Sequence, residues 1–221
     1  MLANNTIGGQ IPDEVSCLFR LQALPLTNNS FQGEIPANLS YSSNLKILRI
    51  GFNNLSRSIP KDLASLSKLE FLAIRTNNLM GGIPPLIGNF SSLQVLSAVE
   101  NVLGGHIPDA LGQLQSLNLL GLSDNKLSGL IPPSLYILSS ITLFALAKSN
   151  LSGSIPMKLS FLSKLEYLYV EQNNLKGGIP AFIGVRLNLI NHFVGFILCQ
   201  FACNSALRNP VFRWESCKSS V

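Results

Sequence analysis

Four cysteines and two histidines are the most chemically reactive side chains in the sequence. Cys199 and Cys203 are separated by three residues, a spacing at which two thiolates can share a metal ion. A structural zinc site needs four ligands, and no further Cys or His stands at a useful spacing. Disulfide pairing among Cys199, Cys203 and Cys217 would leave one thiol over, so we favour unpaired or loosely paired thiols in a poorly ordered tail. Cys17 is expected to be a surface thiol.

Neither histidine has the neighbours that catalysis requires. His106 stands in the polar position of GGHIP, where we favour a solvated side chain on a turn, and no Ser, Cys or Asp pattern points to it or to His192. The sequence has no paired carboxylates, no phosphate loop, and none of the Gly-rich, V-A-I-K-type, H-R-D and D-F-G motifs of a kinase. It therefore predicts no catalytic residue, no metal, no cofactor and no enzymatic activity.

Asparagines in N-x-S/T sequons are the stronger chemical signal, because they predict N-glycosylation in the secretory pathway. A composition rich in Asn and Ser inflates their number. We favour glycosylation because charged residues make up only 12% of the chain and would otherwise leave its solubility poorly explained. The predicted acceptors are Asn4, Asn28, Asn38, Asn54, Asn89 and Asn150.

Composition and charge exclude several classes of protein. Hydrophobic residues make up 47% of the 221 residues, so the chain needs a core and is not predicted to be disordered. The net charge is +5, but no stripe of Lys and Arg marks a nucleic-acid interface. MLANNTIGGQ at the start lacks the features of a secretory signal. The apolar run 193–203 is shorter than the roughly 20 residues that cross a bilayer, so we expect membrane attachment only through parts of a longer protein.

An internal repeat of 24 residues organises most of the chain. Ile-Pro recurs every 24 residues from 11–12 to 179–180, and Gly stands two residues before each Ile except at Arg57. Asn stands six residues before each Ile except at Ser149. The Asn column consists of Asn5, Asn29, Asn53, Asn77, Asn101, Asn125 and Asn173.

These columns predict a solenoid. Segments such as 45–53, LKILRIGFN, contain L-x-x-L-x-L, which predicts a short strand with one buried face. Successive strands would stack in parallel about 4.8 Å apart, and the aliphatic columns would fill a continuous core. The Asn amides are expected to satisfy backbone groups where the chain turns inward, because an amide both donates and accepts. Ser149 is too short for this task. It marks either a local bend or a tolerated lapse, and we favour the lapse.

The complete pattern, L-x-x-L-x-L-x-x-N-x-L-x-G-x-I-P, resembles the plant-specific leucine-rich repeat. The resemblance covers residues 1–183, about eight repeats. It implies an α/β-type repeat solenoid with a parallel β-sheet on the concave face and short 3-10 or irregular segments on the convex face. The stretches 88–114 and 131–146 look most like ectodomains of plant leucine-rich-repeat receptor-like serine/threonine kinases, in the immune-receptor branch of the flagellin sensor and the rice blight resistance receptor. Such an ectodomain would bind a peptide or protein elicitor and recruit a co-receptor kinase, in the apoplast or on the extracellular face of the plasma membrane.

The chain departs from the family at both ends. It begins within a repeat without a Cys-rich N-terminal cap, and the columns are lost after Ile183. We therefore predict a solenoid over 1–183 and a degenerate or poorly ordered tail over 184–221, and we favour a receptor fragment without its kinase. The alternatives are a short receptor-like protein with its own C-terminal cap, a secreted inhibitor of a cell-wall-degrading enzyme, and a truncated copy without function.

Ligand contact is expected at the strand positions that lie between the buried residues. Phe and Tyr beside Arg are typical of interface hot spots. The opposing interpretation is an ordinary solvated sheet face, and for any single residue we favour it. The predicted contacts are Arg49, Phe52, Phe71, Arg75, Glu100, Asp124, Lys148, Tyr167, Tyr169 and Glu171.

Overall fold

The computed structural model describes residues 2–178. The described residues all belong to one compact unit of the chain. The predicted boundary between residues 183 and 184, and the predicted tail, lie outside the described residues.

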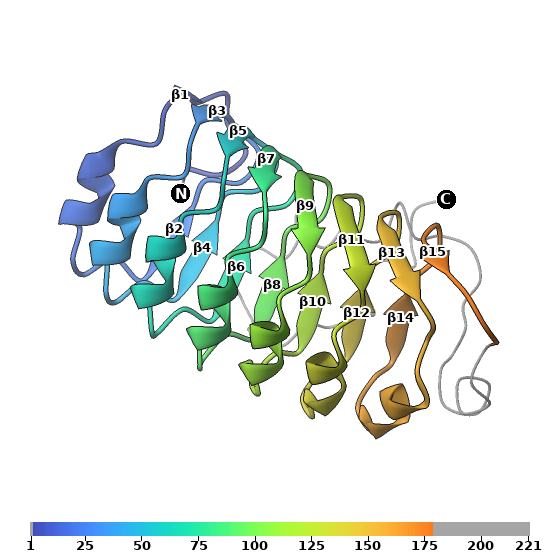
Figure 1. The fold of residues 1–221 in the computed structure, drawn as a ribbon. Helices are drawn as coiled ribbons and strands as arrows, with labels where there is room; N and C mark the ends of the chain where they lie inside the picture. The colour runs from blue at the N-terminus through green and yellow to red at the C-terminus, as the bar shows by residue number, and fades with distance from the viewer. Residues whose placement is uncertain (1, 179–221) are drawn as a thin grey trace, which may run out of the picture. The chain divides into compact units, whose positions relative to one another are not determined.

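Seven short strands, one from each repeat after the first, form a parallel sheet (Figure 1). Their register follows the repeat, since Leu48 pairs with Leu72 and Leu72 pairs with Leu96. These are the strands that L-x-x-L-x-L predicts, and the solenoid fold is confirmed. The strands are β2 (Ala23–Pro25), β4 (Ile47–Arg49), β6 (Phe71–Ala73), β8 (Val95–Ser97), β10 (Leu119–Gly121), β12 (Leu143–Ala145) and β14 (Tyr167–Tyr169).

A second parallel sheet, which the sequence analysis did not predict, contains eight strands and follows the asparagine column (Figure 1). Five of its strands bury a single Leu, such as Leu55 or Leu79, and one buries Phe31 instead, so these sequences lack the alternation by which strands are recognised. The strands are β1 (Gly8–Gly9), β3 (Ser30–Gly33), β5 (Asn54–Arg57), β7 (Asn78–Gly81), β9 (Val102–His106), β11 (Lys126–Leu130), β13 (Asn150–Gly153) and β15 (Asn174–Leu175).

Seven 3-10 helices complete the repeats, and residues 2–178 contain no α-helix. From Pro12 to Pro156, the Pro of each Ile-Pro precedes the helix in an extended conformation, with φ between −60° and −82°. Its fixed φ suits this position, where no N–H is required. The short 3-10 segments predicted for the convex face are confirmed. They are η1 (Asp13–Cys17), η2 (Ala37–Tyr41), η3 (Lys61–Ser65), η4 (Pro85–Asn89), η5 (Asp109–Gln113), η6 (Pro133–Ile137) and η7 (Met157–Phe161).

Aliphatic columns run unbroken through the middle of the stack. Leu45, Leu69 and Leu93 are fully buried, and each such side chain contributes roughly 1.5–3 kcal/mol. Ser42 occupies a column that Leu66 fills in the next repeat, and its buried hydroxyl has no hydrogen-bond partner among the described residues. The core thus tolerates one polar lapse near its beginning. None of the helices over 2–178 is long and apolar enough to cross a membrane.

Each asparagine of the column after Asn5 joins its own turn to the repeat before it. Asn77 donates through Nδ2 to the carbonyl of Ile74 in its own repeat and to that of Ile50 in the preceding one, both at 3.1 Å. Its Oδ1 accepts from the backbone N–H of Leu55 at 3.0 Å. One amide therefore satisfies backbone groups of two repeats, and Asn53, Asn101 and Asn125 make the same set of bonds.

Residues at two positions of each turn adopt the left-handed backbone conformation. The glycine two residues before Ile has φ between +74° and +88° in seven repeats, and Arg57 takes this position with φ +68°. The residue before the asparagine column also has positive φ, between +50° and +58°, whatever its type. The left-handed region costs an ordinary residue roughly 1–2 kcal/mol, so Arg57 is strained where its counterparts are not.

Replacing Arg57 by Gly should raise the free energy of unfolding by about 0.5–1 kcal/mol. The relieved backbone strain exceeds the extra entropy that Gly carries in the unfolded chain. Urea denaturation of the two proteins measures the difference.

Gly105→Ala is the matched control, because Gly105 has φ +74° and a Cβ there would meet no atom within 4 Å. Any loss of stability, expected to be about 1 kcal/mol, then reports the backbone alone. A less stable Arg57→Gly protein would contradict the assignment of strain to this position.

Candidate ligand-binding face

The predicted contact residues lie along the seven-stranded sheet and the turns that leave it. Arg49, Phe71 and the two tyrosines belong to β4, β6 and β14, while Phe52 takes the left-handed position after β4. Strand side chains alternate, so the partly exposed Arg49 and Phe71 point away from the core that contains Leu48 and Leu72. We call the side that they share the outer face because it points away from the core, and it is the face predicted to be concave.

Four of these residues form two reciprocal cation–π pairs across adjacent repeats. The guanidinium carbon of Arg49 lies 5.6 Å from the centre of the Phe71 ring, and that of Arg75 lies 4.4 Å from the centre of the Phe52 ring. Arg49 thus reaches forward to the next repeat and Arg75 reaches back to the previous one. We call Arg49, Phe52, Phe71 and Arg75 the Arg–Phe cluster.

The two arginines differ in exposure. Arg75 is only 6% exposed, whereas Arg49, Phe52 and Phe71 are partly exposed. Burial lowers the pKa of Arg49 from its ordinary value, although a guanidinium stays charged at neutral pH. A ligand on this face would therefore meet Arg49 and the two rings, while Arg75 supports Phe52 from within.

Gly51 makes room for the second pair, a role that the sequence analysis did not assign. A Cβ at Gly51 would lie 2.9 Å from the Arg75 carbonyl oxygen and 3.1 Å from Arg75 Cγ. Real Cβ atoms do not approach backbone oxygens so closely. The sequence offers one sign of this role, because Gly51 stands in a repeat column that holds Thr27, Arg75 and Val99 in other repeats. The contact with Arg75 cannot be read from that pattern.

Polar and charged residues in the middle of the outer face bond to one another across repeats. Thr76 Oγ1 donates to Glu100 Oε2 at 2.7 Å, and Lys148 Nζ lies 3.3 Å from Asp124 Oδ1. The Lys148 and Asp124 side chains are 40% and 33% exposed, so this ion pair adds little stability. Its charges remain accessible to a ligand.

The last predicted contacts lie on β14 and, for Glu171, just after it. The Tyr167 and Tyr169 rings are stacked, with centres 6.4 Å apart and planes 19° apart. Burial and then Glu166 raise the pKa of Tyr167, while burial, Tyr167 and Glu171 raise that of Tyr169. Three strands separate β14 from β6, so a ligand that touched both groups would span roughly 19 Å of sheet.

The other predicted residues fall into three groups. Of the sequon asparagines, only Asn38 is partly buried, and the other five are exposed. Cys17 is an exposed free thiol and His106 is exposed at the end of β9. Cys199, Cys203, Cys217 and His192 lie outside the described residues. Over 2–178 no group of His, Cys, Asp and Glu could hold a metal ion.

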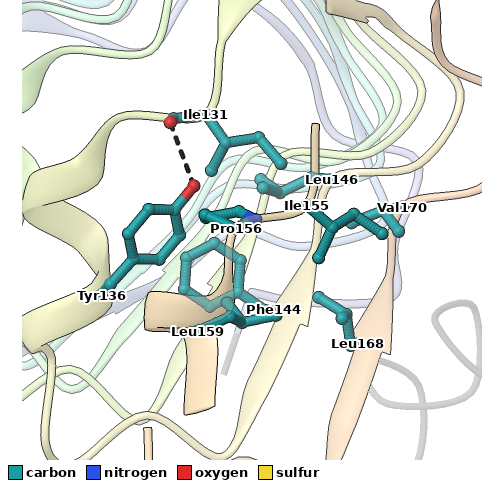
Figure 2. A pocket seen from close by; sticks show the side chains of 9 residues that line it. All are labelled: Ile131, Tyr136, Phe144, Leu146, Ile155, Pro156, Leu159, Leu168 and Val170. Atoms are coloured by element: carbon teal, nitrogen blue, oxygen red, sulfur yellow. Dashed lines mark hydrogen bonds between the residues drawn. The ribbon is translucent and has the colours of Figure 1, made fainter. Parts of the chain in front are cut away.

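A small apolar cavity lies inside the stack near η6 and is separate from the outer face (Figure 2). Its volume is about 10 Å³, which holds about one water-sized sphere, so it is no site for a ligand. Tyr136 borders it and is 3% exposed, and its hydroxyl donates to the Ile131 carbonyl at 3.1 Å. Burial raises the pKa of Tyr136 to about 12. The lining is Ile131, Tyr136, Phe144, Leu146, Ile155, Pro156, Leu159, Leu168 and Val170.

Comparisons with known proteins agree with this geometry. The Leucine Rich Repeat family model matches residues 44–66, 113–138 and 164–185. A search of curated proteins found no match. Among solved structures, the chain is similar to the ectodomain of the membrane receptor kinase GASSHO1/SCHENGEN3 from Arabidopsis thaliana, solved with CASPARIAN STRIP INTEGRITY FACTOR 2. The identity is 34% and the TM-score 0.81, over 82% of this chain and 22% of that one.

Two further similarities bear on the site. The Arabidopsis receptor kinase HAESA, solved with the peptide hormone IDA and the co-receptor SERK1, is 36% identical with a TM-score of 0.80, over 84% of this chain and 32% of that one. A plant ice-binding protein is 27% identical with a TM-score of 0.62, over 82% of this chain and 74% of that one. The chain spans about a fifth to a third of the two receptor chains. These matches support the assignment of this stretch as a non-catalytic leucine-rich-repeat solenoid.

Gly51→Ala should lower the free energy of unfolding by about 1–3 kcal/mol, because the new methyl group forces Arg75 away from Phe52. Urea denaturation gives the loss, and the Arg75 Nε–H resonance reports whether the ring still shields it. Gly104→Ala is the control, since its Cβ would lie an ordinary 3.8 Å from the nearest atom, the Lys126 carbonyl oxygen. An unchanged Arg75 resonance in Gly51→Ala would contradict the role of Gly51.

Alkaline pH should destabilise the stack partly through Tyr136. Its native pKa of about 12 exceeds the ordinary value of 10.0, so the unfolded chain loses this proton first and stability falls between pH 10 and 12. The loss is about 1.4 kcal/mol per pH unit for one proton. Urea denaturation from pH 8.5 to 11 should show a shallower decline in Tyr136→Phe, whereas Tyr41→Phe, at an exposed position, should decline like the unsubstituted protein. Equal declines in all three would contradict the assignment.

Proposed function

We propose that this chain is part of an extracellular receptor ectodomain that binds a peptide or protein ligand on the outer face of the seven-stranded sheet. The observation that carries the proposal is the Arg–Phe cluster, which places charged and aromatic groups together on that face. The finer proposal is a peptide or protein elicitor as ligand, with a co-receptor kinase ectodomain as second partner. The kinase would belong to a longer protein of which this stretch is a part.

The similar structures support this class of ligand. The HAESA structure contains a peptide hormone and a co-receptor, and another similar structure, 36% identical, pairs PEPR1 with AtPEP1. Those partners belong to those receptors. They support the proposal because a similar solenoid binds a peptide in those receptors, at 36% sequence identity to this chain.

The geometry of the cluster suits binding because its side chains are already ordered. Holding a long Arg side chain in one rotamer costs about 0.5–1.5 kcal/mol when it happens on binding. Arg49 already lies over Phe71 in the unbound protein, so part of this rotamer freedom is lost before binding. Aromatic and Arg side chains of this kind are the ones whose truncation most often weakens an interface.

The sequons add support for an extracellular location. Asn54 and Asn150 occupy equivalent exposed positions at the start of β5 and β13 in the eight-stranded sheet, so glycans there would leave the outer face accessible. Asn28 shares the left-handed column with Phe52, one repeat away. A glycan at Asn28 would therefore border the Arg–Phe cluster and limit a ligand to the repeats that follow.

Phe71→Ala should weaken binding of peptides selected on this protein at least about tenfold, the loss typical of a hot-spot aromatic. The probe is a library of random peptides displayed on phage and selected on the immobilised protein, with affinities then measured for synthetic copies. Arg49→Ala should have a similar effect on peptides that carry acidic residues.

Phe161→Ala is the matched control, because Phe161 is 68% exposed on η7, away from the outer face. It should leave affinity within about twofold. Circular dichroism and urea denaturation show whether each variant is folded. Peptides that bind both Ala variants of the cluster as tightly as the unsubstituted protein would place the binding surface elsewhere.

A further inference from the structure

The step from the sixth repeat to the seventh lacks the amide that joins other repeats. Asn125 Nδ2 donates to the Ala98 carbonyl of the preceding repeat, and its Oδ1 accepts from the Leu103 N–H, both at 3.0 Å. Ser149 occupies the next position of this column, and the bond described for its hydroxyl is a long one of 3.4 Å to the Asn125 carbonyl. The turn of the seventh repeat thus lacks the amide bridge, and the short side-chain bond to the sixth repeat nearby is the one that Ser123 Oγ accepts from the Ala147 N–H at 2.9 Å.

The corresponding partners in the sixth repeat can be identified from the repeat itself. At the same offsets, an Asn at 149 would reach the Leu122 carbonyl and the Leu127 N–H. The hydroxyl of Ser149 is too short to span both. The missing contacts therefore lie between the sixth and seventh repeats rather than within one of them.

A second irregularity lies between the same two repeats, where their 3-10 helices η6 and η7 pack together. The column that contains Tyr136 otherwise holds small residues, and in η4 and η5 these are Gly88 and Gly112. A Cβ at Gly88 would overlap the Ala110 carbonyl, and one at Gly112 would overlap the Ser134 carbonyl, so consecutive 3-10 helices approach there to within the space of a methyl group. Tyr136 of η6 excludes so close an approach to η7.

Burial changes at this step as well. The Ile of Ile-Pro is 1–4% exposed in the first five repeats, whereas Ile131 and Ile155 are only partly buried. Both line the small cavity beside the Tyr136 ring (Figure 2). The stack is therefore less tightly filled where the amide bridge is also lacking.

We infer that the solenoid has a weak plane between its sixth and seventh repeats, at which residues 141–178 open as a cooperative unit separate from the repeats before them. Stacked repeats contact only their neighbours, so one weak interface is enough to divide a solenoid into two units. The Arg–Phe cluster lies before the plane and Tyr167 and Tyr169 lie after it. Opening would therefore change the spacing of the two aromatic groups on the outer face.

Amide hydrogen exchange of the full chain, followed by mass spectrometry, tests this inference. We expect a step at the plane, with residues 143–153 exchanging at least about tenfold faster than 95–106. Ser149→Asn supplies the missing bridge and should slow exchange over 143–153 by about tenfold, while 47–57 stays unchanged.

Asn77→Ser is the reciprocal variant, because it removes a bridge from a regular step. It should speed exchange over 54–57 and 78–81 by at least about tenfold and so create a second plane. Ordinary fraying of a stack would instead give a smooth gradient that Ser149→Asn does not alter. A smooth gradient, or equal protection of 95–106 and 143–153, would overturn the inference.

Discussion

The asparagine amide that bridges consecutive repeats is the interaction on which the rest of the molecule depends. Each repeat carries backbone N–H and C=O groups into the interior where the chain leaves one sheet for the other. An unsatisfied buried group costs about 1–3 kcal/mol, and this cost would recur in every repeat. The side chain of Asn77 meets it with bonds to Ile50, Leu55 and Ile74, and so fixes the next repeat in register.

The turn at the asparagine column also determines where side chains of the outer face lie. To bring the asparagine inward, the preceding residue must adopt a left-handed conformation, which aims its side chain beside the end of the strand. In the third repeat that residue is Phe52, and its ring is therefore available to Arg75 of the fourth. Gly51 completes the arrangement by leaving space for the Arg75 stem. A constraint on backbone hydrogen bonding thus decides where the candidate contact residues stand.

The sequence allowed much of this to be predicted, because a strict period links residue type to position. The buried Leu columns and the parallel sheet of L-x-x-L-x-L strands follow from spacing, and the 3-10 segments follow from the resemblance to the plant-specific leucine-rich repeat. The eight-stranded sheet does not, since a strand such as β5 buries one Leu between polar neighbours and is held by pairing with other repeats. The pairing of Arg49 with Phe71 depends on rotamers, and the position of Tyr136 depends on how closely η6 and η7 approach. Neither can be obtained from a pattern of residue types.

The regular register of the two sheets also determines how the molecule would respond to mechanical tension. In both sheets the hydrogen bonds run from each repeat to the next, along the direction of stacking. A force that pulls the terminal repeats apart would load the bonds of one interface at a time, so the solenoid would peel rather than shear. Each detached repeat would release 24 residues of chain, or at most about 80 Å of extended length. Residues 141–178 would come away together at the weak plane, and the repeats before them would then detach in nearly equal increments, so the molecule would act as a compliant element.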